Sequence, residues 1–184
     1  MKYYKICVSG AAETKHCKKC ALDKAKEVGR EVIRQKGVLV TGATSGIPYW
    51  AAIGAKEEKG FSIGISPAAT EKEHIKKYRL PTDYFDVIVY TGFNSSGRNL
   101  LLTRSADAVI IICGRTGTLN EFTIAFEDQK PIGVLEGTGG TADEIKTLVK
   151  RLHKGSGKIV FDKNPKRLVE KLIDLIKKEK EIKI

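Results

Sequence analysis

The sequence has few aromatic residues and no long apolar run. Aromatic residues make up 7% of its 184 residues, whereas 18 residues are glycine, so we expect an aliphatic core with several tight turns. Every apolar run is far shorter than the roughly 18 residues that a membrane span needs, and the N-terminus lacks the apolar segment of a signal peptide. We therefore predict a cytoplasmic protein with no membrane partner.

Internal repeats and low-complexity linkers are also missing. A chain of 184 residues that is 41% hydrophobic is long enough for one well-buried domain and too short for two ordinary ones. We therefore predict a single domain over residues 1–184.

Acidic residues are fewer than basic ones, 22 against 33, and the formal net charge is +11. The basic residues are mostly lysines intermixed with glutamates, without arginines interleaved with aromatic rings. This pattern favours a solvated surface, of the kind seen in heat-adapted proteins, over a nucleic-acid interface. An anionic small molecule is the favoured partner, and nucleic acid is the less favoured alternative.

The chain has four cysteines but a single CxxC, so no second CxxC completes a tetrahedral zinc site. Cys7 and Cys113 lie in or at the end of strand-like runs and need no role beyond packing. Cys17 and Cys20 form a CxxC at the start of a predicted helix, where the helix dipole would stabilise a thiolate. Because only His16 could add a ligand nearby, a redox or metal role is disfavoured. We predict no metal and no resident cofactor.

Short β-branched runs alternate with amphipathic stretches of helix length. This alternation is typical of successive βα units and predicts an α/β fold, a doubly wound parallel sheet of about seven strands with helices on both faces. The predicted strands are Lys5–Ser9, Val38–Thr41, Ser62–Ile65, Val87–Tyr90, Ala108–Cys113, Ile132–Leu135 and Lys158–Phe161. The predicted helices are Cys20–Gln35, Tyr49–Lys59, Arg98–Ser105, Thr118–Glu127, Thr141–Leu152 and Pro165–Lys180.

Capping patterns mark three of the predicted helix starts. Thr118–Glu121 and Thr141–Glu144 match the capping box, and Asn164 precedes a proline at the first helical position. The segment Ser66–Asp86 is the one long irregular stretch before the next strand, and long loops of this kind in compact domains are usually functional or mobile.

Ligands of open parallel sheets bind beyond the carboxyl ends of the strands, where this chain has three glycine-rich turns. The turns are GAAET after Ser9, GATSGI after Thr41 and GRTGT after Cys113. None of them is a P-loop or a dinucleotide fingerprint, and the chain has no Tyr-x-x-x-Lys, which argues against a nicotinamide dehydrogenase. The glycines of the second turn bring the backbone close to a ribose phosphate or to a neighbouring helix, and the pattern does not decide between the two.

The turn after Cys113 has the composition of a phosphate site. Backbone N–H groups at a helix N-terminus bind anions, and Arg115 could add a bidentate contact. On spacing alone a structural role of Glu121 in a capping box is the favoured interpretation, because the capping motif is common and sufficient. Arg98 at a predicted helix start is unfavourable with the helix dipole and indicates an anion nearby, unless it is an exposed arginine in a weak ion pair. We expect Arg98 and Glu121 to share one crevice.

The stretch RNLLLTRSADAVIIICGRTGTLNE, from Arg98 to Glu121, resembles the signature of the LONELY GUY and "possible lysine decarboxylase" superfamily. That signature is an arginine, an alanine–aspartate before a strand, and then P-G-G-x-G-T-x-x-E. The resemblance spans nearly the whole chain and is closest to a branch that is similar to the molybdenum cofactor carrier proteins, with TGFNSSGRN at Thr91–Asn99. It implies a Rossmann-like nucleotide-binding fold and a homodimer or homotetramer.

The resemblance also implies site residues. The family's catalytic arginine and glutamate fall on Arg98 and Glu121. Two departures stand out, because Cys113-Gly114-Arg115 replaces Pro-Gly-Gly and Thr41–Pro48 replaces GGxxGxMG. The residues expected to bind the phosphate or nucleotide are Gly10, Gly42, Gly46, Asn99, Gly114, Arg115, Thr116, Gly117 and Thr118.

Three functions follow as hypotheses. Characterised members of the wider superfamily are phosphoribohydrolases, so the leading hypothesis is release of a base from a nucleoside 5′-monophosphate. Glu121, kept ionised by neighbouring cations, would stabilise the oxocarbenium ion or deprotonate water. The second hypothesis is a non-catalytic carrier or sensor of a phosphorylated ligand such as a pterin cofactor, and the third is single-stranded DNA binding of the DprA kind. A lysine decarboxylase is disfavoured, because no lysine lies in a recognisable pyridoxal-phosphate context.

Overall fold

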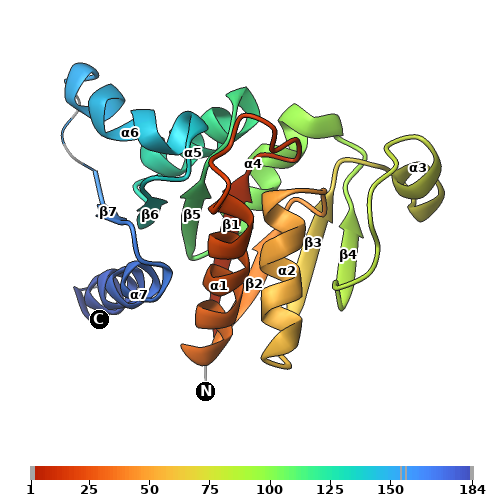
Figure 1. Cartoon of the computed structure of the whole chain (residues 1–184), viewed down its shortest axis with the longest axis horizontal. Helices are drawn as coiled ribbons and strands as arrows, with labels where there is room; N and C mark the ends of the chain where they lie inside the picture. The colour runs from red at the N-terminus through yellow and green to blue at the C-terminus, as the bar shows by residue number, and fades with distance from the viewer. Residues whose placement is uncertain (1–2, 154, 156, 183–184) are drawn as a thin grey trace.

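The computed structural model describes residues 3–153, 155 and 157–182, and strands alternate with helices along them (Figure 1). The strands are β1 Tyr4–Gly10, β2 Gly37–Thr41, β3 Ser62–Ser66, β4 Val87–Tyr90, β5 Ala108–Ile112, β6 Ile132–Leu135 and β7 Ile159–Asp162. The helices are α1 Ala21–Arg34, α2 Ile47–Glu57, α3 Glu71–Lys76, α4 Asn94–Ser105, α5 Thr116–Glu127, α6 Gly140–Arg151 and α7 Pro165–Ile182.

The strands form one sheet in the order β4-β3-β2-β1-β5-β6-β7, and every pairing is parallel. The chain winds outward from β1 to β4 and then returns to place β5 on the other side of β1. The predicted doubly wound α/β fold is therefore confirmed. Its topological switch point lies between β1 and β5, where open sheets of this kind bind ligands.

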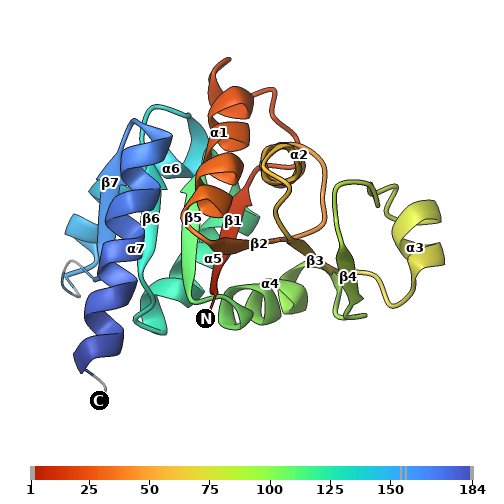
Figure 2. The same ribbon diagram turned by 90° about the horizontal axis from the view of Figure 1, so that it is seen from below.

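Helices cover both faces of the sheet (Figure 2). Helices α1, α2 and α7 pack on one face, and α4, α5 and α6 pack on the other. Strand β5 is buried along its whole length because both of its faces are covered, and its sequence AVIII is accordingly apolar throughout. Most buried side chains are aliphatic, as the composition predicts. No helix of the described part of the chain is long and apolar enough to cross a membrane.

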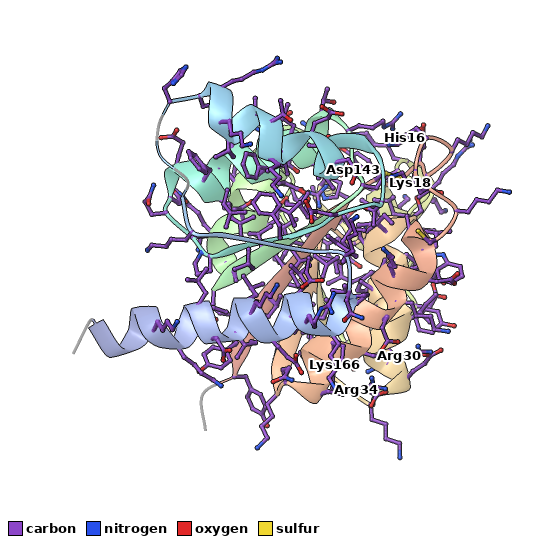
Figure 3. All side chains as sticks on the ribbon, turned by 60° about the vertical axis from the view of Figure 1, so that its left-hand side comes forward. His16, Lys18, Arg30, Arg34, Asp143 and Lys166 are labelled. Carbon is purple, nitrogen blue, oxygen red and sulfur yellow. A yellow bond between two sulfur atoms is a disulfide. The ribbon has the colours of Figure 1, made fainter. Side chains whose placement is uncertain are left out.

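Charged side chains of α1 pair with each other and with α2. Arg30 contacts Glu27 at 2.7 Å, and Arg34 contacts Glu31 at 2.6 Å and Glu58 at 2.7 Å. Figure 3 shows Arg30 and Arg34 beside each other on this helix pair. The pairs occupy a solvated face, which agrees with the interpretation of the mixed Lys and Glu composition as surface.

Two of the three predicted caps are wrong. Helix α5 begins at Thr116 and α6 at Gly140, so neither Thr118 nor Thr141 is a capping residue. At α6 the carboxylate of Asp143 instead accepts hydrogen bonds from the N–H groups of Gly137 and Gly139. Both glycines have positive φ angles, so the chain enters α6 through a glycine turn and not through a threonine N-cap. The third cap is confirmed, because Asn164 Oδ1 accepts from the N–H of Arg167 at 3.0 Å.

The segment Ser66–Asp86 is more regular than predicted. It contains α3, whose first turn is capped by the hydroxyl of Thr70, an acceptor for the N–H of Glu73. The side chain of His74 is fully buried between Ser66 and the carbonyl of Pro81, which ties this segment to the end of β3.

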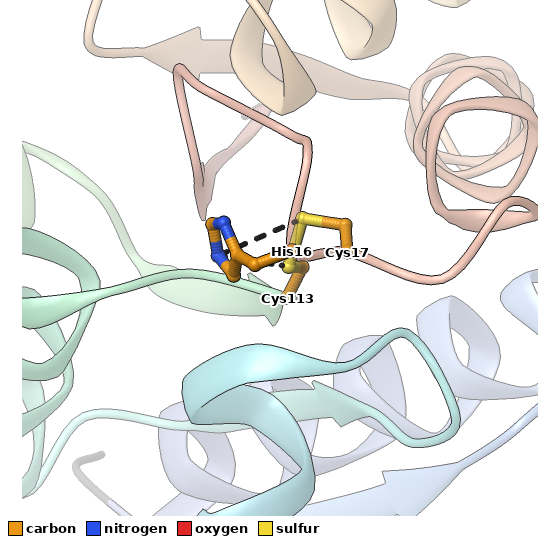
Figure 4. A group of neighbouring side chains, drawn as sticks. All are labelled: His16, Cys17 and Cys113. Atoms are coloured by element: carbon orange, nitrogen blue, oxygen red, sulfur yellow. Dashed lines mark hydrogen bonds between the residues drawn. A yellow bond between two sulfur atoms is a disulfide. The ribbon is translucent and has the colours of Figure 1, made fainter.

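The cysteine expectations are also corrected. Cys113 does more than pack, since it forms a disulfide with Cys17 across 96 positions of sequence (Figure 4). Cys20, the other cysteine of the CxxC, is free and exposed, while Cys7 is free and buried. The disulfide joins the loop after β1 to the residue that follows β5, and these two strands are neighbours in the sheet.

Helices α1 and α2 approach each other through glycines, which yields a first prediction. A Cβ at Gly29 would overlap the carbonyl of Ala51, and one at Gly54 would overlap the carbonyl of Lys26. In an open helix, Gly→Ala gains about 1 kcal/mol of propensity. Here Gly29→Ala should instead lower the free energy of unfolding by about 1–3 kcal/mol, because the packed helices must separate. Urea unfolding measures the change, and a neutral or stabilised variant would show that the helices are not in close contact.

Candidate functional site

A groove lies at the switch point, beyond the carboxyl ends of β1 and β5. Its volume is about 760 Å³, and four segments line it: the loop after β1, the loop after β2, the start of α4 and the start of α5. Both Arg98 and Glu121 are among the lining residues, so the structure brings them to one crevice as the sequence predicted. The doubly wound topology places all four segments at the same edge of the sheet.

The N-terminus of α5 opens directly into this groove. Arg115 is the N-cap residue, and no side chain among the described residues caps the helix. The N–H groups of the first turn are therefore free to bind an anion, and the helix dipole favours negative charge at this end. A Cβ placed at Gly117 would meet no protein atom within 4 Å, so the backbone there borders open space. Thr118 is buried, and its side chain contacts Gly114 rather than acting as a cap.

Arg98 is buried against the sheet and is not an exposed arginine at a helix start. It lies in the second turn of α4, only 7% of its surface is exposed, and its guanidinium occupies the space that a side chain at Gly42 would fill. One guanidinium nitrogen donates to the carbonyl of Ile65 at 3.5 Å, while Nε has no partner among the described residues. Loss of solvent lowers the pKa of Arg98.

Glu121 is held from two sides beneath the groove. The hydroxyl of Ser9 donates to Oε2 of its carboxyl group. In the orientation that satisfies its partners, the amide of Asn99 donates to Oε1 at 2.9 Å and to the carbonyl of Ser95. Glu121 is only 6% exposed, and it forms no direct ion pair with Arg98. It is thus a positioned carboxyl group in the interior of α5 and not a helix cap.

The charge expectation for Glu121 needs correction. Burial raises the pKa of Glu121 above its ordinary value, although Arg98 and the hydrogen bond from Ser9 lower it. Neighbouring cations were expected to favour the carboxylate, but loss of hydration outweighs a single arginine that is not in direct contact. A carboxyl group with a raised pKa accepts a proton more readily at neutral pH than an exposed glutamate does.

Arg115 stands at the edge of the groove, half exposed. Its guanidinium contacts Glu13 at 3.0 Å, in the loop after β1. An exposed ion pair of this kind is weak, so the side chain is available to an incoming anion.

The predicted binding glycines separate into two groups. Gly10 and Gly117 line the groove, whereas Gly42, Gly46 and Gly114 do not. Gly42 makes room for Arg98, Gly46 contacts carbonyls of the loop after β1, and Gly114 contacts Thr118. The last two also have positive φ angles, so both space and backbone conformation require glycine there. The remaining predicted binding residues, Asn99, Arg115, Thr116 and Thr118, line the groove.

Ser9 is the site residue that sequence reasoning missed. It is the last side chain of β1 before Gly10 and lies opposite Ile111 of β5 in the register. The available signal was a hydroxyl directly after the apolar run Ile6–Val8 and before a glycine. Cys7, two residues earlier on the same face, is buried beside Arg98 and Glu121, and burial raises the pKa of its thiol.

A doubly wound parallel sheet with a polar groove at its switch point defines a Rossmann-like α/β protein. A family model matches residues 3–169, and the chain belongs to the SLOG cluster4 family. The predicted resemblance is thereby confirmed at the level of the family, with molybdenum cofactor carrier proteins among its structural relatives.

Known proteins similar to this chain include a sequence relative that covers about three quarters of it and solved structures that share its fold over nearly its whole length. An uncharacterised protein of Archaeoglobus fulgidus is 33% identical over 137 residues, which cover 74% of this chain and 82% of that protein. The molybdenum cofactor binding protein of Rippkaea orientalis is 26% identical with a TM-score of 0.76, covering 97% of this chain and 98% of its own. The Moco carrier protein of Chlamydomonas reinhardtii is 22% identical with a TM-score of 0.79, covering 96% and 99%.

The contact between Ser9 and Glu121 leads to a second prediction. Ser9→Ala removes a donor to the carboxylate, so the pKa of Glu121 should rise further above its ordinary value. A pH titration of the carboxyl carbon resonance in glutamate-labelled protein measures the shift. Ser45→Ala is a matched control, because its hydroxyl donates to Ala12 and does not contact Glu121. A pKa of Glu121 that stays unchanged or falls in Ser9→Ala would contradict the hydrogen bond.

Proposed function

We propose that the groove binds a phosphorylated small molecule, with its phosphate at the N-terminus of α5. The observation that carries this proposal is the uncapped first turn of α5, which borders open space at Gly117. Backbone N–H groups and the helix dipole together attract phosphate, and Arg115 stands close enough to the groove to add a second contact.

Arg98 supports the same proposal independently. A buried guanidinium nitrogen without a partner is unfavourable unless a ligand or water supplies an acceptor. Because Arg98 lines the groove, a ribose hydroxyl or a phosphate oxygen of the ligand can be that acceptor. The phosphate of the ligand would thus be bound at the N-terminus of α5, and Arg98 would orient the ligand from the buried side of the groove.

The chemistry that these groups support is hydrolysis of the N-glycosidic bond of a nucleoside 5′-monophosphate. Glu121, oriented by Ser9 and Asn99, deprotonates the attacking water or stabilises the oxocarbenium ion. Its raised pKa makes it the stronger base. Arg98 holds the ribose or phosphate so that the scissile bond lies above the carboxylate.

The second candidate is a carrier that binds the same kind of ligand without turnover. Two structural relatives are named for binding or carrying the molybdenum cofactor, and their fold matches this chain over almost its full length. A phosphorylated pterin would use the same phosphate site at α5. Turnover distinguishes the two candidates, since both predict binding.

Other partners are less favoured. Many basic side chains of the described residues form ion pairs with acidic side chains on solvated faces. DNA binding of the DprA kind stays an alternative, but the sequence offers no aromatic stacking platform for it. A homo-oligomer stays a prediction, for which the exposed Val87 and Val89 of the edge strand β4 offer apolar surface.

A substitution at Gly117 tests the phosphate position. Gly117→Ala should leave stability unchanged or slightly higher, because alanine favours helix and the new methyl group meets no protein atom. The methyl group would stand where the phosphate approaches, so affinity for the nucleoside 5′-monophosphate that binds best should fall by at least about tenfold, about 1.4 kcal/mol. Isothermal titration calorimetry measures affinity. Unchanged affinity would place the phosphate elsewhere.

A substitution at Glu121 tests the reaction. With a panel of nucleoside 5′-monophosphates, Glu121→Gln should retain binding and lose base release by about a hundredfold or more, because the amide cannot accept the proton. Chromatography detects the free base, and Glu144→Gln, on exposed α6, is the control. Base release that persists in Glu121→Gln would refute the role of this residue. Binding by the native protein without any base release would favour the carrier.

A further inference from the structure

The disulfide and the imidazole of His16 together bring three metal-binding side chains to one place. His16 and Cys17 belong to the loop between β1 and α1, and Cys113 follows β5 (Figure 4). Their ligand atoms, one imidazole nitrogen and two sulfurs, lie within 4.8 Å of one another. Sequence reasoning counted only neighbours of the CxxC and so missed Cys113, which is 96 positions from Cys17.

The distances from the imidazole nitrogen to the two sulfurs are close to those between ligands of a tetrahedral ion. Nε2 of His16 lies 3.5 Å from Sγ of Cys113 and 3.9 Å from Sγ of Cys17. With a zinc–sulfur bond of about 2.3 Å and a zinc–nitrogen bond of about 2.0 Å, tetrahedral angles separate sulfur from nitrogen by about 3.6 Å. The imidazole therefore needs little movement, and only the two sulfurs must separate.

The backbone positions of both cysteines are held by contacts other than the disulfide. The N–H of Cys113 donates to the hydroxyl of Thr138 at 2.9 Å, and its carbonyl accepts from Ala142. Cys17 donates to the carbonyl of Thr14 and pairs with Gly139 in an isolated bridge. Reduction of the disulfide would thus leave the two side chains close together, and the exposed His16 leaves the cluster open to solvent.

We propose that, once the disulfide is reduced, His16, Cys17 and Cys113 bind a thiophilic metal ion such as Zn²⁺, with one coordination position left for water. Reduction by a dithiol transfers two electrons and two protons to the two sulfurs, and the dithiol becomes the disulfide. The metal ion then displaces both thiol protons to solvent, and each thiolate forms one bond to the ion. Two thiolates and a neutral imidazole form a donor set that suits zinc.

Cys20 does not belong to this site. Its thiol faces the carbonyl of Gly137 at 3.7 Å, and it is not part of the three-residue cluster. The site is also separate from the proposed function, because none of its three residues lines the groove. Failure of phosphate binding would therefore leave this proposal standing, and the reverse is equally true.

Zinc titration of the whole chain tests the proposal. Protein reduced with a phosphine, and held without oxygen, should bind one equivalent of Zn²⁺ in competition with a chromophoric chelator. Protein with the disulfide intact should bind at least about tenfold more weakly, since its sulfurs are not available as thiolates. Co²⁺ is the second probe, because thiolate ligands give it a charge-transfer absorption that carboxylates do not.

Variants identify the ligands. His16→Ala and Cys17→Ser should each lower the affinity of the reduced protein for Zn²⁺ by at least about tenfold, and Cys17→Ser should weaken the cobalt charge-transfer band. Cys20→Ser is the matched control and should bind like the native protein. Circular dichroism confirms folding of each variant, and exposed His16 tolerates replacement without repacking. Absence of zinc binding by the reduced protein, or equal losses in Cys17→Ser and Cys20→Ser, would overturn the proposal.

Discussion

The return of the chain from β4 to β5 is the constraint on which the rest of the structure depends. Because β5 pairs with β1 and not with β4, the loops after β1 and β5 diverge to opposite faces and leave a groove between them. The N-terminus of α5 and the second turn of α4 both open into that groove. The site is for this reason assembled from segments that lie far apart in the sequence, and each segment is held by a strand of the sheet or by one of its helices.

Burial sets the electrostatics of the groove. Arg98 and Glu121 lie beneath the groove and are largely shielded from solvent. Burial lowers the pKa of Arg98 and raises the pKa of Glu121, and the attraction between the two groups opposes both shifts. They do not touch, and the guanidinium keeps an unpaired nitrogen. The arrangement leaves room for a ligand between an anchoring helix end and a positioned carboxyl group. The two proposed functions, hydrolysis and binding without turnover, place their ligand in this same groove.

The loop after β1 connects the groove to the group formed by His16, Cys17 and Cys113. Its first residues line the groove, Glu13 pairs with Arg115, and its last residues carry His16 and Cys17. Cys113 directly precedes the turn before α5, and the carbonyl of Gly114 lies 3.3 Å from Nε2 of His16. One short loop thus contacts the turn before α5 at two points, through His16 to Gly114 and through Glu13 to Arg115.

The sequence by itself determined the alternation of strands and helices, the aliphatic core and the turns that carry polar residues. These depend on periodicity and composition, which are local properties. It also indicated Arg98 and Glu121, through the resemblance of their spacing to a known signature. Only the tertiary structure decided that Ser9 and Asn99 hold Glu121, that Gly42 makes room for Arg98, and that Cys17 pairs with Cys113 rather than with Cys20. It also reversed the expected pKa shift of Glu121. The physical reason is the same in each case, because burial and contacts between distant segments arise from the order of strands in the sheet, which no local pattern encodes.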